Sequence, residues 1–215
     1  MNSSPINPSY IQEDIRLACA NRLTCSALPP GAHYIPDFIS QREETRLISL
    51  IDSSDWITDL KRRVQHYGYR YDYRTRGIDY SMYLGVLPQW AEYFAKELFR
   101  CGLMPIVADQ VIVNEYLPGQ GIAPHIDCTP CFEDSIVSIS LGSDCIMNLI
   151  RPSDGTQIDI PLASRSVISL RDDARYKWQH GIKPVKSDII NDVRVARARR
   201  ISLTFRKVKM SGNHR

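Results

Sequence analysis

Three polar residues of this chain could together bind a metal ion: His125, Asp127 and His180. In a His-Ile-Asp sequence at the end of a strand, the His125 and Asp127 side chains lie on the same face, because successive residues alternate. Two imidazoles and one carboxylate occupy one face of an octahedral ion, the ligand set that suits non-haem iron(II). The positions left open can accept a chelating co-substrate and then dioxygen.

A second pair of residues could bind an anion. Arg200 and Arg206 stand six residues apart in the sequence RISLTFR, so on a strand their side chains point to the same face. Burying two guanidinium groups within an otherwise apolar strand is costly unless anions pair with them. A dicarboxylate co-substrate is such an anion, because arginine binds carboxylates in a forked geometry.

Other readings of these five residues fit less well. A hydrolytic zinc site could use His125, Asp127 and His180, but the two strand arginines would then have no partner. A non-catalytic binding module would be free to lose a ligand or an arginine, and all five residues are present. We therefore expect an enzyme.

Apolar periodicity predicts the elements that must position these residues. Ser40 and Glu43 form a capping box before an apolar stripe, which predicts a helix over 40–53. A second amphipathic helix follows Pro88 and stops near Gly102, and a short helix can form over 9–23. The period then changes to two, which predicts strands over 109–116, 136–141, 145–150, 158–162, 166–170 and 200–207. This order predicts an α+β fold, a double-stranded β-helix (jelly roll) with helices packed on one sheet.

Length and composition are those of one soluble globular domain. The chain has 215 residues, of which 43% are hydrophobic and 24% charged. We expect an N-terminal extension over 1–32, a domain over 33–210 and a tail over 211–215, most simply as a monomer. With neither a secretory signal nor a membrane-spanning run in the sequence, we expect an intracellular protein, cytoplasmic or nuclear, that does not bind membranes.

The six cysteines show no framework spacing. In a reducing compartment they are expected to be free thiols rather than disulfides. Cys128 and Cys131 form a CxxC pair, which raises the question of a zinc or redox role. Because no second CxxC is present, we expect a structural or incidental role for this pair.

Ordered motifs around these residues resemble those of the AlkB family of Fe(II)/2-oxoglutarate dioxygenases. They are NxYxPGxxxxxHxD from Asn114, WxHGI around His180 and RxSxTxR from Arg200, and the similarity runs from Tyr34 to Lys209. The family has Asn in the middle of the arginine motif, where this chain has Ser202, whose side chain has a shorter reach. The resemblance is greatest to the dioxygenase domain of tRNA wobble-uridine hydroxylases.

The resemblance implies a role for each matching residue. His125, Asp127 and His180 would bind Fe(II). Arg200 and the Tyr116 hydroxyl would hold the distal carboxylate of 2-oxoglutarate, while Arg206 and Asn114 would contact its chelating end, with Ser202 beside them. Together with dioxygen, the co-substrate would be converted to succinate and carbon dioxide as a substrate C–H bond is hydroxylated.

The substrate is expected to be a modified base in nucleic acid, either in tRNA or in alkylated DNA or RNA. The net charge is only +3, but Lys and Arg cluster over 61–76 and 194–215, which indicates a local anionic partner. Tyr67, Tyr69, Tyr71 and Tyr73 recur at period two, with Arg70 among them, and could stack on bases if the segment is extended. A core strand is the competing interpretation of these tyrosines. A protein substrate, or a non-catalytic regulatory role, is the alternative function.

Overall fold

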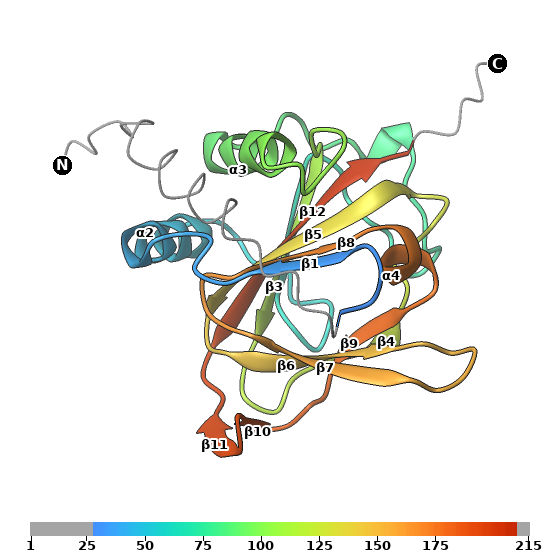
Figure 1. Cartoon of the computed structure of the whole chain (residues 1–215). Coiled ribbons are helices and arrows are strands. Elements are labelled where there is room, and N and C mark those ends of the chain that lie inside the picture. Colours follow the sequence, from blue (N-terminus) through green and yellow to red (C-terminus); the bar gives the residue numbers. More distant parts are fainter. Residues whose placement is uncertain (1–27, 210–215) are drawn as a thin grey trace.

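The computed structural model describes residues 28–209, in which two antiparallel sheets form the layers of a jelly roll (Figure 1). The large sheet has six strands in the order β1-β8-β5-β12-β3-β2, and the small sheet has four in the order β4-β9-β6-β7. The strands of the large sheet are β1 (Ala32–Ile35), β2 (Val64–Tyr67), β3 (Gln110–Tyr116), β5 (Phe132–Gly142), β8 (Val167–Leu170) and β12 (Arg200–Val208). Those of the small sheet are β4 (Ile122–His125), β6 (Cys145–Ile150), β7 (Gln157–Leu162) and β9 (Gln179–Ile182).

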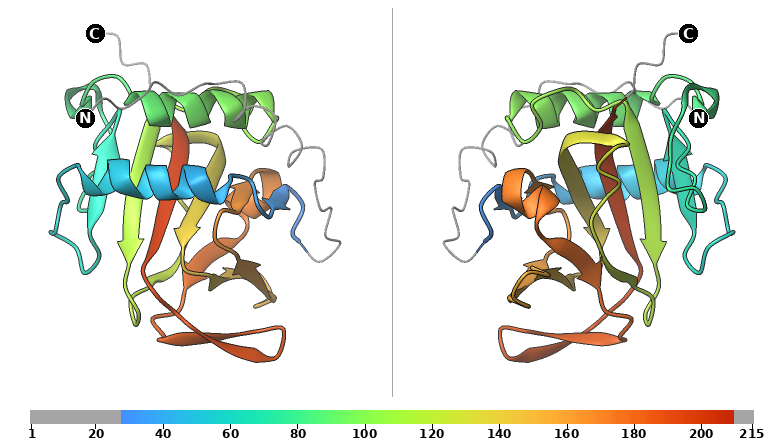
Figure 2. Two further views of the ribbon diagram at one scale, coloured as in Figure 1. Left: turned by 90° about the vertical axis from the view of Figure 1, so that its left-hand side faces the viewer. Right: turned by 90° about the vertical axis from the view of Figure 1, so that its right-hand side faces the viewer.

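Two helices cover the outer face of the large sheet (Figure 2). Helix α2 (Gln41–Asp52) begins after Ser40, whose hydroxyl accepts from the Glu43 backbone N–H while the Glu43 carboxylate accepts from the Ser40 N–H, as the capping box predicts. Helix α3 (Gln89–Arg100) follows Pro88. Apolar residues of both helices pack on β3, β5, β8 and β12 in the larger core. In the described part of the chain, no helix is long and apolar enough to span a membrane.

A second core fills the space between the sheets on the side of β6, β7 and β8. Met147 and Leu149 of β6 pack there against Ile168 and Leu170 of β8, and against Trp178. Short helix α4 (Asp172–Tyr176) closes this side and leads directly into β9. A separate hairpin, β10 (Ser187–Ile190) and β11 (Val193–Ala196), projects beyond the sheets (Figure 1).

The predicted fold class is confirmed, and each of the six predicted strands is present. β5 is longer than predicted, because it begins at Phe132. β1, β2, β4, β9, β10 and β11 were not predicted, since each has only four residues and too short an alternation to be recognised. The helix expected over 9–23 and the tail over 211–215 lie outside the described residues.

The expectation of a continuous extended tyrosine segment is wrong. β2 ends at Tyr67, and Gly68 has a φ of +77°, a left-handed conformation that turns the chain. A Cβ at Gly68 would lie 1.8 Å from the Asp109 carbonyl oxygen, so only glycine fits there. The residues that follow form a loop over 68–79, here called the tyrosine loop, which leads to a 3₁₀ helix, η1 (Tyr80–Met82).

The expectation that the cysteines are free thiols is wrong for three of the four described cysteines. Cys128 and Cys131 are joined by a disulfide, and Cys101 is disulfide-bonded as well. The turn Thr129-Pro130 brings the Cα atoms of Cys128 and Cys131 to 5.2 Å, within the range that a disulfide needs. Within residues 28–209, Cys145 is the free cysteine, and it is buried.

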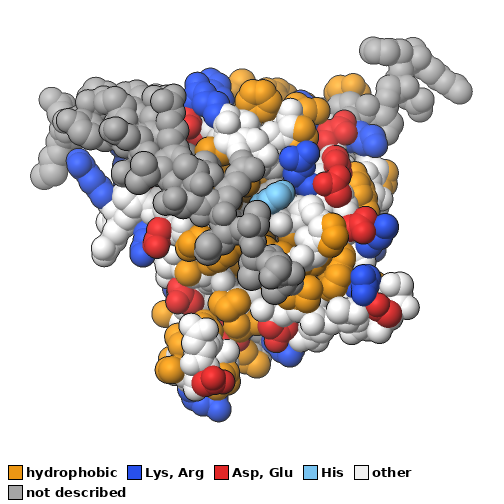
Figure 3. All heavy atoms as spheres, viewed as in Figure 1, with side chains coloured by type: hydrophobic (Ala, Val, Ile, Leu, Met, Phe, Trp, Pro, Cys, Tyr) orange, Lys and Arg blue, Asp and Glu red, His pale blue; other side chains and the backbone are white. Residues whose placement is uncertain are grey.

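Part of the C-terminal basic cluster is neutralised by ion pairs within the protein. Its charged side chains form ion pairs with acids of other elements: Arg197 with Asp188, Arg199 with Asp52 and Glu115, and Lys207 with Asp109. On the face drawn in Figure 3, basic and acidic side chains are interspersed. In the described part of the chain, Arg70, Arg74 and Arg76 of the tyrosine loop form no ion pair. The loop is therefore a better candidate for binding an anionic partner.

Candidate active site

The three proposed metal ligands converge between the two sheets. Nitrogen atoms of His125 and His180 and a carboxylate oxygen of Asp127 all lie within 4.8 Å of one another. His125 ends β4 and pairs in register with His180 of β9, and their ring centroids are 4.4 Å apart. Asp127 lies just beyond the end of β4, where its carboxylate is 3.7 Å from His125 Nε2. Two imidazoles and one carboxylate thus face a common point, which fits one iron(II) ion.

The protonation states of these side chains suit metal binding. His125 Nδ1 lies 2.8 Å from the Ala123 carbonyl oxygen, which can only accept a hydrogen bond, so the proton is on Nδ1 and Nε2 is left as the ligand atom. Burial lowers the pKa of His180 to about 4, so this imidazole is neutral at neutral pH. Burial would raise the pKa of Asp127, but Arg206 and the two histidines outweigh it and hold that pKa well below its usual range.

Alternate residues of β12 supply the polar floor of the site. Arg200, Ser202, Thr204 and Arg206 line one cavity, while the residues between them belong to the core under α2 and α3. The cavity has a volume of about 330 Å³ and also contains all three metal-ligand side chains. The sequence pattern of β12 therefore separates core packing from the lining of the site.

Both arginines are buried and keep N–H groups without a partner. Arg200 is 3% exposed and donates from Nη2 to Ser140 Oγ at 2.8 Å, while its Nε and Nη1 have no partner. Arg206 is 7% exposed, and its Nε and Nη2 donate to the Asp127 carboxylate at 3.2 to 3.3 Å, leaving Nη1 free. Buried donors without partners are rare and costly, so these two guanidinium groups fit an anionic co-substrate in the cavity.

The other three residues expected around the co-substrate also line this cavity. Tyr116 of β3 pairs in register with Arg200, and the Arg200 guanidinium lies 5.6 Å from its ring centroid. Burial raises the pKa of the Tyr116 phenol, which therefore stays protonated and can donate a hydrogen bond. Asn114 pairs in register with Ser202, and its side-chain oxygen accepts from Arg62 Nε at 2.9 Å.

Of the five residues expected to contact the substrate, Tyr71 and Tyr73 line the cavity. Tyr67 packs edge-on against Trp90 on the side of the larger core, with ring centroids 5.4 Å apart. Tyr69 packs against Tyr83, and Arg70 is exposed outside the cavity. The turn at Gly68 is the reason, because it ends the alternation on which the expectation relied.

Several cavity or support residues were missed in the sequence. Arg76 of the tyrosine loop lines the cavity, as does Arg62, which lies just before β2. In the sequence, both arginines belong to the basic and aromatic stretch over 62–76. The composition of that stretch does not show which of its side chains turn inward.

Arg175 of α4 is 3% exposed and donates to the Asp127 and Cys128 carbonyl oxygens at 3.0 and 3.3 Å. The sequence gives one indication that Arg175 lies near the site, which is its position five residues before His180.

Comparison with known proteins agrees with this geometry. The family model of the 2OG-Fe(II) oxygenase superfamily matches residues 31–206. The chain belongs to the 2OG-Fe(II) oxygenase superfamily. A solved structure of the same fold, "The structure of OsALKBH1", matches this oxygenase with a TM-score of 0.67 at 18% identity, covering 84% of this chain and 98% of that one. The predicted resemblance to the AlkB family is confirmed.

Two of three curated relatives of this chain have the names of AlkB-type proteins, and the third is named as an uncharacterised protein. An Arabidopsis thaliana protein named "Alkylated DNA repair protein ALKBH8 homolog" is 37% identical, covering 84% of this chain and 59% of that protein. A Macaca fascicularis protein named "tRNA (carboxymethyluridine(34)-5-O)-methyltransferase ALKBH8" is also 37% identical, covering 86% of this chain but 31% of that protein. A mimivirus protein, L905, is 35% identical and is covered over 85% of its length. This chain therefore spans 59% of the length of the first relative and 31% of the length of the second.

Proposed function

We propose that this protein is an Fe(II)- and 2-oxoglutarate-dependent dioxygenase that oxidises a modified base in nucleic acid. The observation that carries the proposal is one cavity that contains both a two-histidine, one-carboxylate ligand set and two buried arginines with unpaired N–H groups. A metal site alone would not explain the two buried arginines, and an anion site alone would not explain the three metal-ligand side chains.

Iron(II), 2-oxoglutarate and dioxygen would together supply the oxidising power for hydroxylation of a substrate C–H bond. His125, Asp127 and His180 would hold the ion. The Arg206 contact orients the Asp127 carboxylate from one side, while Arg175 fixes the backbone carbonyl of the same residue. Such supporting hydrogen bonds set ligand orientation and metal affinity.

The chain's own residues would seat the co-substrate in one direction. Arg206 contacts a metal ligand, so it lies at the metal end of the cavity. Arg200 contacts Tyr116 and Ser140 instead, which makes it the candidate for the carboxylate farther from the metal. Asn114 and Ser202, adjacent across β3 and β12, lie between the two arginines in the order of the strand. This arrangement supports the roles that the family resemblance implies.

A nucleobase substrate is supported by the residues at the cavity wall that faces the tyrosine loop. Tyr71 and Tyr73 offer aromatic faces on which a base can stack, and Arg62 and Arg76 add positive charge. A base would have to leave its stack to reach the metal, which favours single-stranded or flipped nucleotides. The names of the relatives point to tRNA uridine or alkylated DNA as candidate substrates. An intracellular location, cytoplasmic or nuclear, is part of this proposal.

The test is mass spectrometry of nucleosides after reaction with Fe(II), ascorbate and 2-oxoglutarate. Total tRNA and methylated oligonucleotides of DNA and RNA are incubated with the protein, and succinate is measured in parallel. The expected result is a hydroxylated or demethylated nucleoside together with substrate-stimulated succinate. Asp127→Ala is the matched inactive control. Succinate formation that no nucleic acid stimulates would contradict the nucleic-acid assignment and favour a protein substrate.

A further inference from the structure

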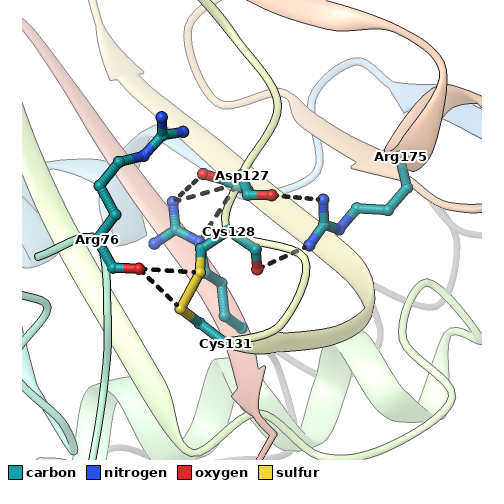
Figure 4. Close-up of a disulfide and its surroundings, with 6 residues drawn as sticks. Arg76, Asp127, Cys128, Cys131 and Arg175 are labelled. Carbon is teal, nitrogen blue, oxygen red and sulfur yellow. Dashed lines mark hydrogen bonds and ion pairs between the residues drawn. A yellow bond between two sulfur atoms is a disulfide. The ribbon is translucent and has the colours of Figure 1, made fainter.

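The Cys128–Cys131 disulfide lies directly beside the metal-ligand set, and the proposed function does not use it. Cys128 follows the ligand Asp127 in the sequence, and the two half-cystines are separated by two residues. Figure 4 shows the disulfide between the segment that carries Asp127 and the backbone of Arg76. A bond at this place can connect the redox state of two thiols to the site.

Two contacts link the disulfide to its surroundings. The Cys128 and Cys131 sulfur atoms lie 3.2 and 3.4 Å from the carbonyl oxygen of Arg76, in the tyrosine loop. Behind them, the Cys131 carbonyl accepts from the Lys209 N–H at 2.8 Å. The CxxC turn is therefore fixed to the end of β12 on one side and touches the tyrosine loop on the other.

The two sulfur positions differ in access. Cys128 lines the cavity and is half-buried, so a small solute entering the cavity can reach it. Cys131 is 6% exposed and packs in a small cluster with Phe132 and Val208. An accessible cysteine with a buried partner three residues farther on is the arrangement in which one thiol reacts first and the other resolves the product.

We propose that Cys128 and Cys131 are a reversible oxidation site that reacts with two-electron thiol oxidants, either hydrogen peroxide or a low-molecular-weight disulfide such as oxidised glutathione. With peroxide, both S–H bonds and the O–O bond break, the S–S bond forms and two waters leave. With oxidised glutathione, two successive exchange steps form the same bond and release two molecules of glutathione. Reduction by a dithiol returns both protons and electrons to the sulfurs.

The oxidation state of this site would control the tyrosine loop rather than the metal ligands. In the disulfide the sulfurs have no hydrogen to donate and only touch the Arg76 carbonyl, whereas the two thiols of the reduced pair can each donate a hydrogen bond to it. Asp127 keeps its contacts with Arg175 and Arg206 in either state, because neither contact involves a sulfur. We expect a more firmly held tyrosine loop in the reduced protein, with metal affinity nearly unchanged. This inference does not depend on the proposed activity.

Thiol trapping tests the chemistry. The full chain is equilibrated in glutathione buffers of increasing oxidised fraction, or treated with hydrogen peroxide, then alkylated and analysed by peptide mass spectrometry. The expected result is joint loss of alkylation at Cys128 and Cys131, with a mass decrease of two hydrogens, reversed by a dithiol. Buried Cys145, alkylated after denaturation, is the internal reference. A pair that stays reduced under both oxidants, or that glutathione cannot reduce in the folded protein, would overturn the proposal.

Limited trypsin digestion tests the structural consequence without any need for turnover. Arg70, Arg74 and Arg76 place tryptic sites within the tyrosine loop, and exposed Arg194 in β11 provides a remote control site. Reduction should slow cleavage of the loop on the order of fivefold, because the two thiols then donate hydrogen bonds to the Arg76 carbonyl, and should leave Arg194 cleavage unchanged. The double variant Cys128→Ser/Cys131→Ser should match the reduced protein under all redox conditions. Equal loop cleavage in the oxidised and reduced wild-type protein would refute control of the loop by the disulfide.

Discussion

Replacement of Arg200 by Met separates the co-substrate role of this residue from a structural one. Arg200 is buried, and its Nε and Nη1 have no partner in the protein. If they bind a carboxylate of 2-oxoglutarate, their removal should cost about 3 kcal/mol of binding free energy, as for one partner of a buried hydrogen-bonded charge pair. That corresponds to a rise in the KM for 2-oxoglutarate on the order of a hundredfold.

Although Arg200→Met should weaken 2-oxoglutarate binding, it should not destabilise the fold. Without co-substrate, wild-type Arg200 is a buried charge with unsatisfied donors, so an apolar side chain of similar length should leave stability unchanged or increase it. Arg197 provides the matched control, because it is also buried but donates to Asp188 at 2.5 and 2.7 Å. Arg197→Met should lose about 3 to 5 kcal/mol of stability and leave the KM for 2-oxoglutarate unchanged.

The assays are succinate production at varied 2-oxoglutarate and thermal unfolding with and without the co-substrate. Addition of 2-oxoglutarate should raise the Tm of the wild type and of Arg197→Met, but not that of Arg200→Met. Arg200→Lys should fall between wild type and Arg200→Met, because it keeps the charge and loses the forked geometry. A KM for Arg200→Met within about twofold of the wild type would refute the carboxylate assignment.

Three further predictions concern metal binding, the pH dependence of protein stability and the binding of nucleic acid. Arg175→Met should weaken metal binding by about tenfold, measured by equilibrium titration, because the Asp127 carbonyl loses its donor, and Arg175→Lys should partly restore it. Burial lowers the pKa of His66 from 6.5 to about 4, so the unfolded chain takes up a proton first as the pH falls, and stability should decline by up to about 3 kcal/mol between pH 6.5 and 4. Urea unfolding of His66→Phe should show a decline smaller by that amount, and an unchanged pH dependence would contradict the assignment. Tyr73→Ala should raise the KM for nucleic acid severalfold and leave the KM for 2-oxoglutarate unchanged, and a change in both would point to disruption of the whole cavity.

The β12 strand shows what the sequence alone could predict. Its arginines alternate with Ile201, Leu203 and Phe205, so the period of two shows both that it is a strand and that its polar face needs an anion. The helix after Ser40 was similarly predictable, because its capping box is a local signal. Such features depend on neighbours in the sequence.

The features that were missed depend on contacts between distant segments. No pattern near Arg206 shows that it pairs with Asp127, 79 residues away in the chain. The tyrosines at period two predicted an extended face, but the close approach of Gly68 to Asp109 turns the chain after Tyr67. The CxxC pair was considered only as an isolated motif, whereas its position under the Arg76 carbonyl is what gives it a candidate role.

Anaerobic titration with Fe(II) tests the central claim most directly, with the metal content per chain measured in the wild type and in His125→Ala, Asp127→Ala and His180→Ala. The account predicts one ion per wild-type chain, loss of tight binding in each of the three variants, and 2-oxoglutarate binding that strengthens when the ion is present. Tight binding of iron by His180→Ala with wild-type affinity would contradict the account, because His180 would then not be a ligand.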